Sequence, residues 1–229
     1  IGAIHDVLRE HDKALEYYQN SLEISKEIND KNGMARETIN ISNLYNTTGD
    51  VHKALSMQKE CIKLCKKSNN QPLLAYSYNL SGVIYSNLSK YDESIKSLKK
   101  CLKIKKELNE PEGIASAFKS IGVIYYYKGQ YNQAMVYHKK SLKHRKEIGY
   151  RAGIGESLSF IGDTYKKMGE YDNAISSYQE SLSIMEFLKD DEHASKILNR
   201  LGNIYRKMGE YDIALKILKK AEKLKNKIK

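Results

Sequence analysis

The hexapeptide KMGEYD spans residues 167–172 and returns unchanged at residues 207–212, 40 positions later. A catalytic motif has no reason to recur at a fixed interval, whereas a structural unit that stacks on copies of itself does. The interval extends through the whole chain. Stepping back from Gly202 by 40 gives a very small residue each time: Gly162, Gly122, Gly82, Ser42 and Gly2. Six units therefore account for the 229 residues without an insertion, and the first unit is truncated.

Three further positions repeat with the same period. A tyrosine three places after the small residue recurs as Tyr45, Tyr85, Tyr125, Tyr165 and Tyr205, with His5 in the first unit. A second small position holds Ala14, Ala54, Ser94, Ala134, Ala174 and Ala214. A third small position holds Ser21, Cys61, Cys101, Ser141, Ser181 and Ala221. We expect side chains that recur at one register to have the same structural role in every unit.

Each unit is predicted to fold as two helices. From Tyr171 the apolar or small residues recur at steps of three and four, the spacing that forms one stripe on an α-helix, and a similar stripe precedes it. Gly169 lies between the two stripes, where glycine can end a helix in the left-handed conformation without a steric cost. We also predict that small residues at Gly162 and Ala174 let the paired helices cross closely.

The combined pattern resembles the tetratricopeptide repeat. It contains a small residue, a tyrosine three places later, G-x-Y at the turn, an alanine three places after that tyrosine and a second small residue seven beyond. The usual unit has about 34 residues, so both helices are expected to be longer here. The 40-residue form is similar to the repeats of kinesin light chains, spindle-orientation adaptors and bacterial peptide-sensing regulators. The resemblance implies an all-α, right-handed solenoid of antiparallel helix pairs.

Continuity of the repeat predicts a single domain over residues 1–229. No Gly/Ser-rich stretch interrupts the period, and Pro72 and Pro111 stand where one unit passes to the next. No run approaches the ~18 apolar residues of a membrane span. No signal peptide is visible either, although Ile1 already falls in the middle of a predicted helix. Three cysteines without a disulfide framework suit a reducing compartment, so we expect a cytoplasmic protein without membrane association.

The sequence carries no recognisable catalytic signature. It lacks G-x-S-x-G, a phosphate-binding loop and H-E-x-x-H. His5 and His138 stand at registers that other units fill with tyrosine or leucine, so we interpret them as repeat-position variants. Cys61 and Cys101 are interpreted as small packing residues. We therefore expect no enzymatic activity, no catalytic residue, no metal and no cofactor.

In the family that the chain resembles, the first helix of each unit lines a concave groove that binds a protein or peptide segment. Asparagine amides at groove registers match the donors and acceptors of an extended peptide backbone. Lysine and arginine would pair with acidic ligand residues, and tyrosines would shape the groove. The predicted peptide-binding residues are Arg36, Asn43, Asn46, Tyr76, Asn79, Lys119, Tyr126, Tyr127, Lys166, Lys167, Asn199, Arg200, Asn203, Arg206 and Lys207. We expect a protein or peptide partner, and an acidic one fits these registers.

Chaperone-binding members of the family hold a C-terminal carboxylate in a clamp of basic residues and asparagines. Lys119, Lys196 and Arg200 match the basic registers, whereas Val123 and Phe160 stand at the asparagine registers. A receptor for chaperone tails is therefore not expected, but a carboxylate-bearing segment still fits this end of the chain.

Three other interpretations stay open. The chain could be the sensory or scaffolding arm of a larger signalling protein, such as a kinase, a transcription regulator or a protease. The lysine-rich second helices could bind nucleic acid, because the formal charge is +11 and a basic stripe releases counterions from phosphate. The tyrosines disfavour this, since they stand at core registers and not among the lysines. Self-association could use apolar residues of the last helix: Ile217, Leu218, Leu224 and Ile228.

Overall fold

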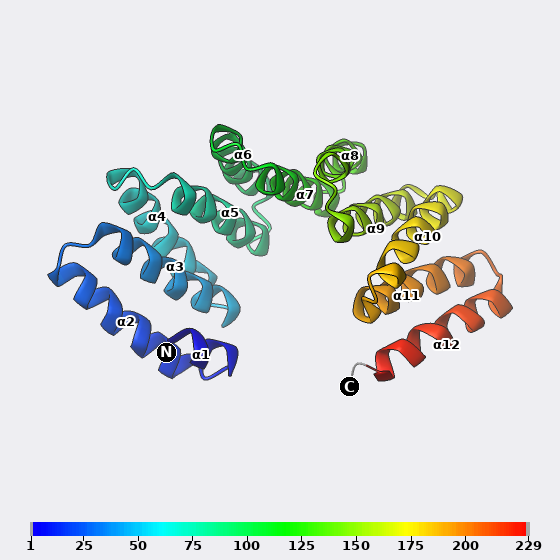
Figure 1. Ribbon diagram of the computed structural model, residues 1–229, viewed down its shortest axis with the longest axis horizontal. Helices are drawn as coiled ribbons and strands as arrows, with labels where there is room; N and C mark the ends of the chain where they lie inside the picture. Colours follow the sequence, from blue (N-terminus) through cyan, green and yellow to red (C-terminus); the bar gives the residue numbers. More distant parts are fainter. Residues whose placement is uncertain (1, 228–229) are drawn as a thin grey trace. The chain divides into compact units, whose positions relative to one another are not determined.

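The computed structural model describes residues 2–227, which fold into α-helices joined by short turns (Figure 1). The helices are α1 (Gly2–Val7), α2 (His11–Glu27), α3 (Lys31–Thr47), α4 (Val51–Lys67), α5 (Gln71–Asn87), α6 (Tyr91–Glu107), α7 (Pro111–Tyr127), α8 (Tyr131–Glu147), α9 (Arg151–Met168), α10 (Tyr171–Phe187), α11 (Asp191–Lys207) and α12 (Tyr211–Lys227). No strand occurs in this range. The predicted class, an all-α solenoid of antiparallel helix pairs, is confirmed. Ile1 and Ile228, used in two of the predictions, lie outside the described residues.

The helices form two compact units, which divide the chain between Gly113 and Ile114. The first unit contains the pairs α1–α2, α3–α4 and α5–α6. The second contains α7–α8, apart from the first residues of α7, and then α9–α10 and α11–α12. Within each unit the second helix of one pair also contacts the first helix of the next pair, as α4 does with α5 (Figure 1). That residues 1–229 form one domain stays a prediction.

A left-handed backbone residue recurs every 20 positions and sets the helix lengths. Positive φ angles occur at Arg9, Asn29, Gly49, Asn69, Ser89, Asn109, Gly129, Gly149, Gly169, Lys189 and Gly209. After Gly169, for example, the Glu170 amide donates to the Tyr165 carbonyl at 3.0 Å, which is the hydrogen bond of a Schellman helix end. Helices of 17 or 18 residues result. The glycine turns between the two helices of a pair were predicted. The turns between successive pairs, several of which use asparagine, were not.

Each recurring glycine accommodates a side chain from the partner helix, 16 positions later. A Cβ at Gly162 would lie 2.7 Å from the Tyr178 ring, and one at Gly82 would lie 2.7 Å from Leu98. These partner side chains are almost completely buried. Small residues at the register of Ala174 do lie where the paired helices approach closely, since the equivalent Ser94 hydroxyl donates to the Gly82 carbonyl at 2.6 Å. Ala174 is fully buried, but the Tyr178 ring is what excludes a side chain at Gly162.

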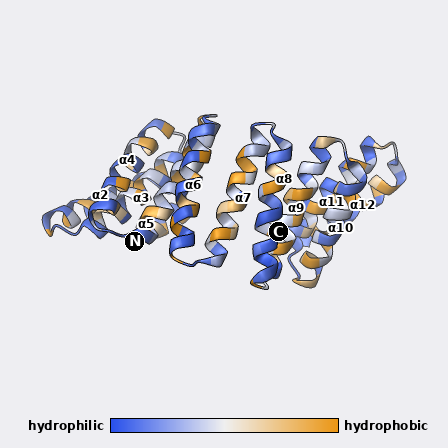
Figure 2. Cartoon of the chain, turned by 90° about the horizontal axis from the view of Figure 1, so that it is seen from above, coloured by the Kyte–Doolittle hydropathy of each residue, from blue (hydrophilic) through white to orange (hydrophobic). Residues whose placement is uncertain are grey.

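The third small position ties the two helices of a pair together. The Ser181 hydroxyl donates to the Gly155 carbonyl at 2.6 Å, and the Ser141 hydroxyl donates to the Ala115 carbonyl at 2.8 Å. The Cys61 thiol makes the equivalent contact, with its Sγ 3.4 Å from the Ala35 carbonyl oxygen. Cys61 therefore has the predicted packing role. Figure 2 shows hydrophobic residues recurring along the helices between hydrophilic ones.

The left-handed turn positions give a direct stability test. We predict that Gly169→Ala lowers the free energy of unfolding by about 1–2 kcal/mol, because an L-residue is strained at the φ of 83° found there. Urea denaturation measures the change. As a matched control, Ser89→Ala exchanges one L-residue for another at the same register and should change stability by less than about 0.5 kcal/mol. Equal effects of the two substitutions would contradict the assignment.

Candidate functional site

In each unit, the first helices of the pairs carry the predicted binding residues at exposed or half-buried positions, and we call these residues the first-helix face. In the first unit α3 and α5 contribute Arg36, Asn43, Asn46, Tyr76 and Asn79. In the second unit α7, α9 and α11 contribute Lys119, Tyr126, Tyr127, Lys166, Lys167, Asn199, Arg200, Asn203, Arg206 and Lys207. All are exposed or half-buried. The predicted residues thus form two groups, one in each unit, and a groove shared by both units stays a prediction.

In the first unit, polar side chains pair between α3 and α5. The Asn43 amide donates to the Tyr76 hydroxyl at 3.3 Å. The Asn87 amide donates to the Asn46 side-chain oxygen at 2.9 Å. Each of these asparagines retains hydrogen-bonding groups, because an amide side chain offers two N–H donors and an oxygen with two lone pairs. The pairs therefore orient the amides and leave them able to bind a peptide backbone.

In the second unit, three side chains bind the carboxylate of Asp163 on α9. The Tyr178 hydroxyl, from α10, donates to its carboxylate at 2.6 Å. Arg200 lies 3.3 Å from the other carboxylate oxygen, and Lys166 lies 3.6 Å away. Arg200 also donates to the Ser159 hydroxyl. Burial, together with the neighbouring Asp163 charge, raises the pKa of Tyr178, so this phenol stays protonated as the donor.

A second carboxylate on α9, Glu156, binds two cations. Lys119 of α7 lies 2.9 Å away, and Arg145 of α8 lies 2.7 Å away. The Arg145 side chain is only 5% exposed and also donates to the Gly153 carbonyl at 2.7 Å. Burial alone would raise the pKa of Glu156, but the charges of Lys119 and Arg145 outweigh it, so the pKa is lowered. Lys119, predicted to contact a ligand, therefore already neutralises a carboxylate of its own chain.

Three predicted cations of the second unit pair with no carboxylate of residues 2–227. Lys167, Arg206 and Lys207 are exposed at the ends of α9 and α11, and no carboxylate within residues 2–227 lies at ion-pair distance from them. Asn199 and Asn203, also on α11, each donate to a backbone carbonyl four residues earlier, at 3.0 and 2.8 Å. The charge open to a ligand in this unit is therefore concentrated at these helix ends.

Two tyrosines on α7 lie in the same unit. Tyr126 and Tyr127 meet edge to face, with 5.8 Å between the ring centroids, and Tyr126 meets Tyr131 at 5.7 Å. Tyr127 is 61% exposed. Burial raises the pKa of Tyr126 to about 12, so its hydroxyl is an uncharged donor at neutral pH. The aromatic surface thus comes from α7 and the open positive charge from α9 and α11.

His138 of α8 is the residue whose environment the sequence reasoning missed. It occupies the register of Tyr178 as predicted, is 1% exposed and stacks on Phe160 with ring centroids 5.4 Å apart. Neither ring nitrogen has a hydrogen-bond partner among residues 2–227. Burial, with a smaller effect from the charges of Arg145 and Lys119, lowers the pKa of His138 to about 4. The imidazole is therefore neutral at pH 7.

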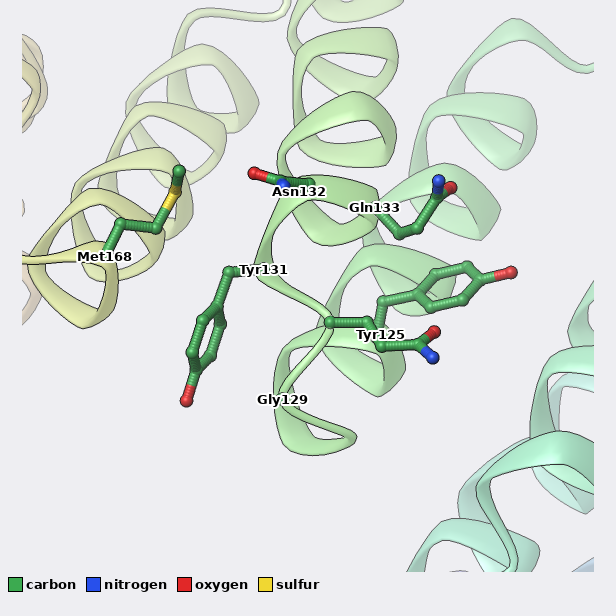
Figure 3. Close-up of a pocket in the computed structure, with 7 residues that line it drawn as sticks. Tyr125, Gly129, Tyr131, Asn132, Gln133 and Met168 are labelled. Atoms are coloured by element: carbon green, nitrogen blue, oxygen red, sulfur yellow. The ribbon is translucent and has the colours of Figure 1, made fainter.

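The second unit also contains hollows of different character. One, of about 870 Å³, is an open depression at the turn between α7 and α8, lined by Tyr125, Gly129, Gln130, Tyr131, Asn132, Gln133 and Met168 (Figure 3). A pocket of about 270 Å³ borders His138, and one of about 200 Å³ lies between α9, α10 and α11. The latter two share Phe160 and Arg200. The depression in Figure 3 carries no charged side chain, so the charged first-helix face remains the candidate site.

Metal binding and membrane insertion are two other functions on which residues 2–227 can be judged. These residues contain no group of three or more His, Cys, Asp or Glu side chains placed to hold a metal ion. None of the helices in this range combines the length and the apolar character needed to cross a membrane. Cys61, Cys65 and Cys101 are free and buried.

Comparisons with known proteins identify the repeat. A family model described as tetratricopeptide repeat matches residues 1–67, 73–147 and 153–227. BtubC (BKLC) from P. vanneervenii has a similar structure, with a TM-score of 0.82 and 18% identity over 95% of this chain and 92% of that one. The apo form of RapI has a TM-score of 0.74 and 14% identity over 100% of this chain and 81% of that one. A Rap protein complexed with competence and sporulation factor has a TM-score of 0.65 and 14% identity over 99% of this chain and 73% of that one. No curated protein matches the sequence.

Because Arg145 is buried, the contribution of its carboxylate partner Glu156 to stability can be tested. We predict that Glu156→Gln lowers the free energy of unfolding by about 3 kcal/mol at pH 7, the low end of the usual cost of leaving one member of a buried ion pair alone, since Glu156 is partly exposed. Chemical denaturation measures the loss. Glu192→Gln is the control, because its pair with Lys196 is exposed and should contribute nothing measurable. A loss no larger than that of the control would refute the role of Glu156.

His138 should make stability depend on pH. Its ordinary pKa of about 6.5 applies in the unfolded chain, which takes up a proton as the pH falls below that value. The folded protein does not protonate His138 until about pH 4. Stability is therefore lost as the pH falls through this window, by about 3 kcal/mol at its lower end, from ~1.4 kcal/mol per pKa unit.

His138→Leu should remove this loss and keep the fold, because Leu98 and Leu218 occupy the same register. Urea denaturation of both proteins from pH 7 to pH 4 makes the comparison. We expect the difference in stability between variant and wild type to grow by about 3 kcal/mol on acidification. Parallel profiles would show that His138 is not held neutral.

Proposed function

Because this chain belongs to the tetratricopeptide repeat family, we propose that it binds an extended protein or peptide segment along the first-helix face. The family fold generally serves as a non-catalytic scaffold for protein interactions, and no enzymatic activity is proposed here. The proposal places the ligand backbone on the asparagines and acidic ligand side chains on the exposed cations.

The open positive charge on α9 and α11 is the observation that carries the proposal. Glu156 and Asp163 already form ion pairs with Lys119, Lys166 and Arg200, whereas no carboxylate within residues 2–227 lies at ion-pair distance from Lys167, Arg206 and Lys207. Cations from two adjacent helices favour a ligand that carries carboxylates at more than one position. The partner that fits best is therefore an acidic, extended segment.

The asparagines of the first unit supply a different type of contact. Asn43 and Asn46 are each oriented by a side chain from α5, so less conformational entropy is lost when a ligand binds them. An amide can donate to and accept from a peptide group without selecting its side chain. Sequence preference is therefore expected from the cations of the second unit more than from these amides.

A sensory arm of a larger signalling protein is the second candidate. The observation that favours it is the structural similarity to a Rap protein complexed with competence and sporulation factor. In that case the segment bound on the first-helix face would be a signal, and a further domain would respond to it. The same binding site serves both candidates, so one set of experiments addresses it.

The decisive experiment selects peptides from a random 12-residue display library on the immobilised protein. We predict that selected peptides are enriched in Asp and Glu. Reversing three cations together, Lys167→Glu, Arg206→Glu and Lys207→Glu, should weaken their binding about ten-fold or more, as expected for the loss of about 1.4 kcal/mol. Fluorescence anisotropy of the labelled peptides measures the affinity.

The control reverses three exposed lysines of the second helices, Lys139, Lys216 and Lys219, and leaves the same net charge. It should change the affinity for the peptide by less than about two-fold if only charges close to the bound peptide affect binding, because salt screens more distant ones. If the control weakens binding as much as the first variant does, binding depends on overall charge and the assignment fails. A gel-shift assay with single-stranded RNA and duplex DNA at low salt tests the remaining alternative, nucleic acid on the second helices.

A further inference from the structure

A pocket in the second unit reaches from the first-helix face to the buried His138. Its volume is about 270 Å³, which corresponds to roughly nine water molecules. Its walls come from α7, α8, α9 and α11, and the residues that line it are Val123, Tyr126, Tyr127, His138, Phe160, Asp163 and Arg200. The pocket is large enough for a group the size of a substituted phenol and is separate from the exposed cations at the helix ends.

His138 brings unused hydrogen-bonding capacity to this pocket. Buried polar groups in folded proteins nearly always have a partner, yet both imidazole nitrogens are buried without one. The next pair of helices shows what is missing. There Tyr178 stands at the same register and donates to Asp163 at 2.6 Å. At the positions that correspond to Tyr178 and Asp163, the α7–α8 pair has His138 and Val123, so the imidazole faces an aliphatic side chain where a carboxylate would stand.

The remaining walls select against charge. Asp163 and Arg200 carry opposite charges and lie 3.3 Å apart, so together they add no net charge to the wall. Val123, Phe160 and the two tyrosines supply apolar surface. The imidazole is neutral at pH 7 because burial holds its pKa near 4. An ionic ligand group would lose its hydration here without gaining a counter-ion.

We propose that this pocket binds a small, uncharged apolar group that ends in a hydroxyl, and that the hydroxyl hydrogen-bonds His138. A hydroxyl both donates and accepts, so it can satisfy whichever ring nitrogen it meets. The group can belong to a side chain of a bound peptide or to a free small molecule, since the chemistry is the same. The site does not depend on an acidic ligand at Lys167, Arg206 and Lys207.

The test compares 4-methylphenol with toluene, which has the same ring and methyl group without the hydroxyl. Ligand-observed NMR measures the affinity of each, and the Cε1–H signal of His138, assigned with the His138→Leu variant, reports the location. We expect saturable binding of 4-methylphenol that shifts this signal, and binding of toluene at least about five-fold weaker, which corresponds to roughly 1 kcal/mol for one hydrogen bond. No saturable shift with 4-methylphenol, or equal affinity for both, would overturn the proposal.

Two variants and a control distinguish the contribution of the hydrogen bond to His138 from that of the pocket volume. His138→Leu should abolish the preference for 4-methylphenol over toluene. Val123→Phe, which fills the pocket from α7 and leaves His138 in place, should weaken both probes. Gln58→Leu is the control, because Gln58 shares the register and the complete burial of His138 but belongs to the first unit; it should alter neither affinity. Retention of the preference in His138→Leu would assign the hydroxyl to another partner.

N-acetyl-tyrosinamide distinguishes the two sources of the hydroxyl group. If a side chain of a bound peptide enters the pocket, this probe should also shift the His138 signal. If the pocket admits only free small molecules, 4-methylphenol binds and the amide does not. Both results support the pocket, and neither depends on the library selection, so failure of the acidic-peptide proposal and failure of this one are distinguishable.

Discussion

A left-handed residue at every twentieth position is the constraint on which the rest of this structure depends. It ends each helix after nearly the same number of turns, so residues 40 apart occupy equivalent places in successive pairs. Equal helices let the small residues meet a buried side chain from the partner helix at one register, as Gly162 meets Tyr178. They also place the exposed registers of the first helices in rows. The first-helix face is thus a consequence of helix length, which the turns determine.

Electrostatics divides that face into satisfied and open parts. Glu156 and Asp163 lie on α9 between the cations of α7 and α11, and each forms ion pairs with two of the neighbouring basic side chains. These contacts hold the pairs of the second unit in register and compensate part of the positive charge at the centre of the face. Lys167, Arg206 and Lys207 at the helix ends pair with no carboxylate of residues 2–227. The second unit therefore presents an ion-paired, partly aromatic region and a basic region whose charge is uncompensated.

The sequence predicted the helix pairs, the glycine turns and the residues of the first-helix face, because these follow from period and register alone. It did not predict the turns at Asn29, Asn69 and Asn109, since asparagine adopts the left-handed conformation less often than glycine and is therefore a weaker signal in a sequence. The engagement of Lys119 and Arg200 was also missed, because their partners lie 37 residues away in both cases. One signal was available. The α9–α10 pair has Asp163 with Tyr178, a polar pair, whereas the α7–α8 pair has Val123 with His138 at the same positions.

The central claim is that a ligand lies on the first-helix face. A selected acidic peptide with a nitroxide spin label, added to the isotope-labelled protein, tests it most directly, because the label broadens NMR signals of nearby nuclei. The account predicts broadening of residues on α9 and α11, including those next to Arg206, and no effect on the exposed lysines of α8 and α12. Broadening confined to α8 and α12 would contradict the account.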